Sequence, residues 1–254
     1  MAILAAFQRR LIYFPDSTPV PGAGEVIEGA RDVTLRTSDG IALGAWFVPP
    51  SPVSDLHLGV LVAPGNAGNR AGRVGLANEL SQRGFAVFLM DYRGYGGNPG
   101  SPSEAGLGRD AMAAALALDE LGYLSERTIY LGESLGTAVV AALQARRPPA
   151  AMVLRSPFPE LADVGTRHYP WLPVRLLLKD EFRVSERLSE SEVPVTVVYA
   201  DRDSVVPSEL SARVAHDTPR LVERVVIRGA DHNDEVMFGP RVADAVARLG
   251  SALG

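Results

Sequence analysis

Residues 128–140 place a Gly-x-Ser-x-Gly pattern between a β-branched and aromatic run and a run rich in helix formers. A strand that enters a helix through so tight a turn holds the middle residue, Ser134, in a strained conformation with its hydroxyl exposed. Glycine is expected at 132 and 136 because side chains there would collide where strand and helix converge. The helix would point its positive end and the N–H of Leu135 at the reacting centre. The pattern is short, so its meaning depends on an acid and a histidine following in the right order.

Composition limits the classes of protein that the chain can belong to. With 254 residues, 46% hydrophobic and 22% charged, it suits one large α/β domain or two small ones in a soluble protein. The net charge of −5 and the lack of a basic block argue against a nucleic-acid partner. The absence of cysteine excludes disulfides, a thiol nucleophile and thiolate metal sites. No Gly-x-Gly-x-x-Gly follows a predicted strand and no metal-ligand pattern is visible, so we predict no cofactor.

The N-terminal residues are apolar but form too short a run to span a bilayer. Two arginines follow the run instead of preceding it, unlike in a secretory signal. The pattern suits a helix packed on the protein's own surface, or alternatively an interfacial helix, formed by Ile3, Leu4, Phe7, Leu11, Ile12 and Phe14. We therefore expect a cytoplasmic protein, with weak peripheral membrane contact through residues 3–14 as the open alternative.

Strand and helix patterns alternate along the chain. Runs at 33–36 and 43–48 flank an Asp39-Gly40 turn and predict a hairpin. Continuous apolar runs typical of buried strands occur at 58–63 and 85–90. Other strand-like runs occur at 128–131, 152–154, 195–199 and 225–227. Helices are predicted between them, one opening with a capping box at Ser101-Pro102-Ser103-Glu104 and Pro102 in its first turn. The alternation predicts an α/β fold: a mostly parallel eight-stranded sheet with helices on both faces.

The segment 157–192 interrupts this alternation. It carries four prolines together with Tyr169, Trp171 and an apolar run at 176–178. We expect a small, partly helical cap insertion over the carboxyl edge of the sheet, within a single domain that covers residues 1–254.

Ligands of an open parallel sheet bind outside the carboxyl ends of its strands. The polar residues at those ends are Asn66, Asp91, Ser134, Ser156, Asp203 and His232. A serine nucleophile needs a base, and the base needs a third group to fix its tautomer. Asp203 and His232 follow Ser134 in the order Ser, Asp, His expected of a Gly-x-Ser-x-Gly hydrolase. We predict His232 as general base and acid and Asp203 as its orienting carboxylate, with Asp201 as a competing acid.

The other histidines have less suitable positions. His57 precedes its strand and should lie at the opposite edge of the sheet, and His216 lies in a predicted helix as a surface residue. His168 lies in the insertion, where it could approach a ligand.

Acyl transfer also needs two donors for the oxyanion. The N–H of Leu135 is predicted to be one, and the N–H of Asn66, in the loop after Ala63, the other. The alternative for Asn66 is support of a glycine-rich turn.

Several motifs together resemble a known family. They are Phe7-Gln8-Arg9-Arg10-Leu11-Ile12-Tyr13-Phe14-Pro15, Gly65-Asn66-Ala67-Gly68-Asn69, Asp91-Tyr92-Arg93-Gly94-Tyr95-Gly96, Gly132-Glu133-Ser134-Leu135-Gly136, Ser156-Pro157-Phe158, Trp171-Leu172-Pro173-Val174-Arg175, Asp203-Ser204-Val205-Val206-Pro207 and His232-Asn233-Asp234. Through them the chain resembles the α/β-hydrolase superfamily, and within it the BEM46-like and ABHD13/ABHD17-like group, nearly from end to end.

The resemblance implies an α/β-hydrolase fold and a serine hydrolase that acts on esters or thioesters. It also favours Asp203 over Asp201, because the family's acid stands four residues before the proline at 207. Two positions depart from the family pattern. Pro64 replaces a histidine of the oxyanion loop and cannot make that histidine's hydrogen bonds, and Asp231 stands where glycine is common.

These observations predict a hydrolase of the carboxylesterase type that acts on a small-molecule ester or acyl substrate through an acyl-serine intermediate. Two alternatives stay open: a weakly active or inactive fold that binds a lipid or protein partner, and an acyltransferase.

Overall fold

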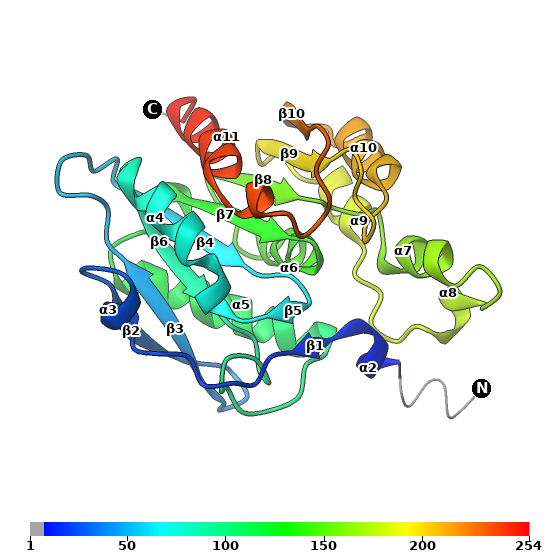
Figure 1. Ribbon diagram of the computed structural model, residues 1–254, viewed down its shortest axis with the longest axis horizontal. Coiled ribbons are helices and arrows are strands. Elements are labelled where there is room, and N and C mark those ends of the chain that lie inside the picture. Colours follow the sequence, from blue (N-terminus) through cyan, green and yellow to red (C-terminus); the bar gives the residue numbers. More distant parts are fainter. Residues whose placement is uncertain (1–7, 254) are drawn as a thin grey trace.

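The computed structural model describes residues 8–253, and its centre is one eight-stranded sheet (Figure 1). The strand order is β10-β9-β8-β7-β4-β6-β3-β2. The strands are β2 (Arg31–Arg36), β3 (Ala42–Val48), β4 (Leu58–Ala63), β6 (Phe85–Met90), β7 (Thr128–Glu133), β8 (Ala151–Arg155), β9 (Val195–Ala200) and β10 (Leu221–Ile227). In this sheet β3 runs antiparallel to both neighbours, and the other pairs are parallel. The predicted mostly parallel, eight-stranded α/β sheet is confirmed.

Helices cover both faces of the sheet, as its apolar strands require. Every residue of β4, β6, β7, β8 and β9 is buried. Successive side chains of a strand point to opposite faces, so Leu61 joins one core and Val62 the other. The first core includes residues of α5 (Glu104–Glu120), α6 (Leu135–Gln144), α9 (Val184–Ser189) and α10 (Ser208–Asp217). The second includes residues of α3 (Ala23–Val26), α4 (Val74–Gln82) and α11 (Pro240–Ser251).

The hairpin before the first parallel strand forms as predicted. Strands β2 and β3 pair antiparallel with Thr34 opposite Gly44, and Gly40 takes a positive φ of 83° in the connecting turn. Such a φ favours glycine, which explains the Asp39-Gly40 signal.

The start of α5 differs from the prediction. Ser103, not Ser101, is the N-cap: its hydroxyl accepts a hydrogen bond from the N–H of Gly106 at 3.1 Å, and the helix begins at Glu104. The Glu104 carboxylate accepts hydrogen bonds from the N–H groups of Glu181 and Phe182 at 2.6 and 3.1 Å. The predicted capping box is therefore wrong, because Ser103 supplies the cap two residues later and Glu104 is engaged by the insertion.

The segment between β8 and β9 is partly helical, as expected. It contains α7 (Leu161–His168), α8 (Val174–Leu177) and α9. Helices α7 and α8 extend away from the sheet, while α9 lies against it (Figure 1). Short 3-10 helices η1 (Arg70–Arg73), η2 (Ser125–Arg127) and η3 (Glu235–Phe238) complete the connections.

The N-terminal segment adds a feature that was not predicted. One helical turn, α2 (Arg9–Ile12), is followed by β1 (Phe14–Pro15), which pairs in parallel with β5 (Ala67–Gly68). Ile12 is buried, whereas Leu11 and Phe14 are exposed. The predicted helix is thus a single turn in this part of the chain, and its positions Ile3, Leu4 and Phe7 lie outside the described residues. Among residues 8–253, no helix combines the length and the apolar character needed to cross a bilayer.

Candidate active site

Ser134 occupies the sharp turn between β7 and α6. Its φ of 51° and ψ of −115° are unfavourable for a residue with a side chain and persist only when the surroundings enforce them. A Cβ on Gly132 would lie 2.6 Å from the Gly136 carbonyl oxygen, and one on Gly136 would lie 2.6 Å from that of Pro64. The two glycines therefore allow the backbones to approach, as the sequence predicts.

Asp203 and His232 meet at the carboxyl edge of the sheet. Nδ1 of His232 lies 2.7 Å from Oδ2 of Asp203, and both side chains are buried. Facing a carboxylate, Nδ1 carries the proton, so Nε2 is the atom available to a serine hydroxyl. Within residues 8–253 the Ser134 hydroxyl makes no hydrogen bond to His232; such contacts commonly tighten only when a substrate binds.

Arg155 joins the serine turn to the histidine loop. The N–H of Ser134 donates to the Arg155 carbonyl oxygen at 2.8 Å, and Nη1 of Arg155 donates to the His232 carbonyl oxygen at 3.1 Å. Burial lowers the pKa of the Arg155 guanidinium, while the nearby Glu133 carboxylate opposes that shift. Ser134 and His232 are therefore both hydrogen-bonded to one buried residue.

The competing acid, Asp201, lies apart from His232. Its Oδ1 accepts a hydrogen bond from the N–H of Gly229 at 2.6 Å and its side chain is exposed. Asp203 is the carboxylate that contacts the histidine, which agrees with the choice that the family resemblance favoured.

Two further polar residues, Ser156 and Asp231, hold the loops that carry Asp203 and His232. The Ser156 hydroxyl donates to Oδ2 of Asp203 at 2.9 Å. The Asp231 carboxylate accepts from the N–H and hydroxyl of Ser204 at 2.7 and 2.8 Å and from the N–H of His232 at 2.6 Å. These hydrogen bonds lower the pKa of Asp231, so it stays ionised and fastens one loop to the other.

The loop after β4, residues 64–69, is predicted to supply an oxyanion donor and is called the oxyanion loop here. It is held on both sides of the peptide that carries the Asn66 N–H. The Tyr92 hydroxyl donates to the Pro64 carbonyl oxygen at 2.9 Å, and the Tyr95 hydroxyl donates to the Asn66 carbonyl oxygen at 2.9 Å. Burial raises the pKa of both phenols, which keeps them protonated as donors. Leu135 is the first residue of α6, where a backbone N–H has no partner inside the helix. The N–H groups of Asn66 and Leu135 thus belong to a loop and to a helix N-terminus that meet beside Ser134.

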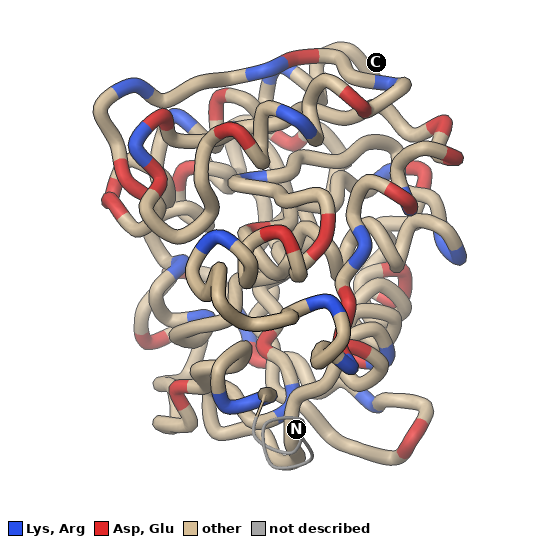
Figure 2. The backbone as a smooth tube through the Cα atoms, turned by 90° about the vertical axis from the view of Figure 1, so that its right-hand side faces the viewer, with Lys and Arg blue, Asp and Glu red and all other residues tan. Residues whose placement is uncertain are grey.

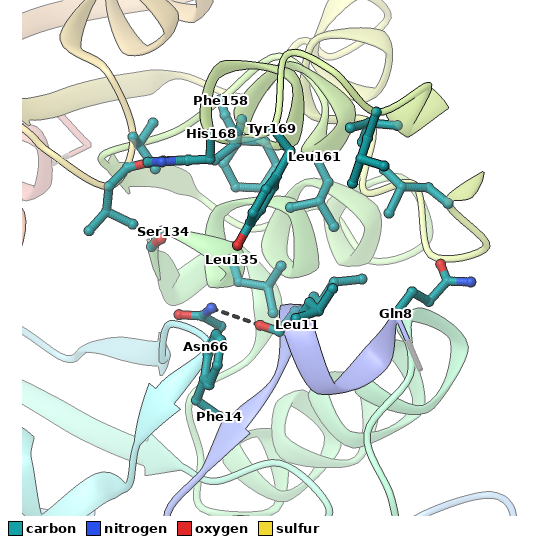
Figure 3. A pocket seen from close by; sticks show the side chains of 18 of the residues that line it. Gln8, Leu11, Phe14, Asn66, Ser134, Leu135, Phe158, Leu161, His168 and Tyr169 are labelled. Carbon is teal, nitrogen blue, oxygen red and sulfur yellow. Dashed lines mark hydrogen bonds between the residues drawn. The ribbon is translucent and has the colours of Figure 1, made fainter. Parts of the chain in front are cut away.

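A cavity of about 320 Å³ opens beside these residues (Figure 3). Ser134, Leu135 and Asn66 line it together with residues of the N-terminal segment and of α7, α8 and the chain that follows α8. None of the described lining residues is an Asp, Glu, Lys or Arg. The site is therefore suited to an uncharged, apolar group next to the serine.

The remaining histidines lie where the sequence predicts. His168 on α7 lines the cavity, with Nε2 2.8 Å from the Val205 carbonyl oxygen. His57 is exposed before β4, at the opposite edge, and His216 is exposed on α10.

A family of known proteins matches this chain. The model of the family described as alpha/beta hydrolase fold matches residues 60–193. The chain belongs to the α/β-hydrolase fold family. This α/β hydrolase is 47% identical over 244 residues to Uncharacterized protein Rv2307c of Mycobacterium tuberculosis, covering 95% of this chain and 86% of that protein. It is 32% identical over 211 residues to Alpha/beta hydrolase domain-containing protein 17C of Xenopus tropicalis, covering 80% of this chain and 64% of that protein. The expected resemblance is confirmed.

A solved structure gives the same fold. The structure of the Pyrococcus furiosus esterase PF2001 superposes with a TM-score of 0.72 at 21% identity, covering 95% of this chain and 97% of that one. At this identity the likeness shows the fold alone.

Sequence reasoning missed part of the scaffold of this α/β hydrolase. Glu133 and Arg155 are charged residues at the ends of otherwise uncharged strands, and that contrast was a usable signal for a buried ion pair. Residues 8–15, which contact the oxyanion loop, show no periodic sequence signal because they form only one helical turn and a two-residue strand.

Proposed function

We propose that this α/β hydrolase is a serine carboxylester hydrolase that works through an acyl-serine intermediate. The observation that carries the proposal is the 2.7 Å contact between Asp203 and His232 at the sheet edge that also presents Ser134. A histidine oriented by a buried carboxylate is the activating pair that a serine nucleophile needs.

In the proposed reaction, Ser134 Oγ attacks the acyl carbon while its proton moves to Nε2 of His232. The N–H groups of Asn66 and Leu135 donate to the oxyanion of the tetrahedral intermediate. The bond to the leaving oxygen then breaks, and His232 gives its proton to that oxygen. Water repeats the sequence on the acyl-serine: its proton moves to His232, the acid leaves, and the proton returns to Ser134. A thioester would follow the same steps with sulfur as the leaving atom.

The cavity supports a substrate with an apolar acyl or alcohol group of limited size. Its volume of about 320 Å³ lies at the small end of ligand pockets, which span roughly 300–1,000 Å³. Its described lining contains no Asp, Glu, Lys or Arg that would favour an ionic group.

We also propose that the face formed by the N-terminal segment and the insertion makes weak contact with a lipid surface. The exposed fractions of Leu11 and Phe14, which line the cavity, are 57% and 53%, and those of Trp171 and Leu176 in the insertion are 73% and 84%. Acidic and basic residues are interspersed on this side (Figure 2), so the attraction would come from apolar burial and not from net charge. We expect the protein to co-sediment with phosphatidylcholine vesicles independently of salt. Unchanged co-sedimentation of a Trp171→Ser, Leu176→Ser double variant would contradict the proposal.

The test of catalysis is hydrolysis of p-nitrophenyl esters from acetate to palmitate. We expect Ser134→Ala and His232→Ala to lose activity, with His216→Ala as the matched histidine control that keeps it. Asp203→Asn should lower kcat by roughly 10³–10⁴, because the wrong histidine tautomer is favoured, whereas Asp201→Asn should stay near wild type.

Other outcomes separate the alternatives. If the wild type is inert and a fluorophosphonate fails to label Ser134, the protein is a non-catalytic member of the fold. If an added alcohol captures the acyl group in preference to water, it is an acyltransferase.

A further inference from the structure

The N-terminal segment, residues 8–15, is hydrogen-bonded directly to the oxyanion loop. The N–H of Phe14 donates to the Asn66 carbonyl oxygen at 2.8 Å, and Nδ2 of Asn66 donates to the Ile12 carbonyl oxygen at 2.7 Å (Figure 3). The β1–β5 pairing continues these contacts from Ala67 onwards. The side chain and the carbonyl group of Asn66 are thus both engaged in holding the loop, and its backbone N–H is the group left to serve an oxyanion.

The same segment is also fixed to the insertion, through the side chains of Arg9 and Tyr13. The Arg9 guanidinium donates to both carboxylate oxygens of Asp180 at 2.9 and 3.2 Å, and the Tyr13 hydroxyl donates to Oδ2 at 2.9 Å. Asp180 and Tyr13 are buried, and the Tyr13 ring meets Phe182 edge-on at 6.3 Å. Burial and the adjacent carboxylate raise the pKa of Tyr13, so its hydroxyl remains a donor.

Residues of this segment also form a wall of the cavity. Leu11, Ile12 and Phe14 line it opposite residues of α7 and α8 (Figure 3). The segment therefore contacts three parts of the proposed active site: the oxyanion loop, the cavity and the insertion.

We propose that residues 8–15 act as a strap that couples the insertion to the oxyanion loop, with Asn66 as the positioning residue at one anchor and Tyr13 with Arg9 at the other. This inference rests on the proposed hydrolase function. The strap holds the Asn66 peptide where its N–H meets the oxyanion, so loosening either anchor lowers transition-state stabilisation more than substrate binding.

The experiment compares an Asn66→Ala variant with a cap-anchor variant that combines Arg9→Ala and Tyr13→Phe. With p-nitrophenyl acetate, we expect each to lower kcat by about tenfold with KM within about twofold, the pattern of a lost transition-state interaction. The matched control combines Arg183→Ala with Tyr130→Phe. It removes the exposed ion pairs of Arg183 with Glu181 and Glu186 in the same region. It also removes the buried hydroxyl of Tyr130, which donates to the Arg147 carbonyl oxygen elsewhere in the molecule.

Combining the two anchor variants distinguishes a strap from two independent effects. If one strap carries both effects, releasing its second anchor adds little, and the combined variant loses about as much kcat as the worse parent. Losses that multiply, or single losses no larger than those of the control, would overturn the proposal. Thermal unfolding of every variant shows whether the fold is kept.

Hydrogen exchange separates failure of the strap from failure of the proposed function. In the folded cap-anchor variant, amide exchange of residues 65–69 should rise by about tenfold while that of β4 stays unchanged. This readout needs no activity: faster exchange in an inert protein would support the strap and reject the hydrolase, and unchanged exchange would reject the strap.

Discussion

Individual hydrogen bonds orient the Asp203 carboxylate. Its Oδ2 faces both His232 and Ser156, while its Oδ1 accepts from the N–H groups of Val205 and Val206 at 3.0 and 2.6 Å. We predict that Ser156→Ala lowers kcat/KM by about tenfold, as a buried hydrogen bond to a charged group is worth about 1.5–3 kcal/mol and the carboxylate keeps its other donors. Ester hydrolysis measures this loss. Ser156 has a φ of 50°, so Ser156→Gly should lose as much activity but be more stable than Ser156→Ala. Equal stability of the two variants, or full activity of either, would contradict this account.

At the same scale, the sequence indicated which residues meet but not how they are held. Ser134, Asp203 and His232 could be placed together because strand ends of a parallel sheet share one edge. The contact of Ser156 with Asp203 could not, since it depends on the loop conformation at a positive φ. The side chain of Asn66 was likewise unpredictable, because its partner lies 54 residues away in a segment without a strand pattern.

At the scale of elements, β7 and α6 approach the oxyanion loop closely enough that only glycine fits at 136. We predict that Gly136→Ala lowers kcat at least 100-fold, because a Cβ would press on the carbonyl oxygens of Ala63 and Pro64 and displace the loop that carries Asn66. Overpacking of this kind also costs about 1–3 kcal/mol of stability. Gly108→Ala on α5 is the control: nothing lies within 4 Å of its added Cβ, and helix propensity favours it by about 0.5–1 kcal/mol. Similar activities of the two variants would show that the close approach is unimportant.

Long elements were predictable where short ones were not. Apolar runs such as 58–63 and 85–90 mark strands because burial on both faces leaves no polar position. Strands β1 and β5 have two residues each and show no period, so only their tertiary pairing defines them. The start of α5 was misplaced because Ser101 and Ser103 offer the same capping chemistry, and the contact of Glu104 with the insertion decides between them.

At the scale of the whole molecule, one buried charge network spans three loops of the site. Glu133 accepts from Nε of Arg73 at 3.0 Å and lies 3.8 Å from Arg155. Arg73 also donates to the Asn69 carbonyl oxygen at 3.1 Å, and Arg155 to that of His232 at 3.1 Å. The network therefore connects the oxyanion loop, the serine turn and the histidine loop. The sequence shows the three charges but not their convergence, which depends on the order of strands in the sheet.

We predict that Glu133→Gln destabilises the protein by about 3 kcal/mol, because it leaves two buried guanidinium groups without their carboxylate. For a domain of this size that lowers the Tm by about 10 °C, which calorimetry measures. The variant should also lose kcat, since Arg155 would no longer be held between Glu133 and the His232 loop. Glu79→Gln is the matched control: its pair with Arg83 is partly exposed, so the expected shift is below about 2 °C. Equal Tm shifts in the two variants would mean that the network contributes no more than a surface pair.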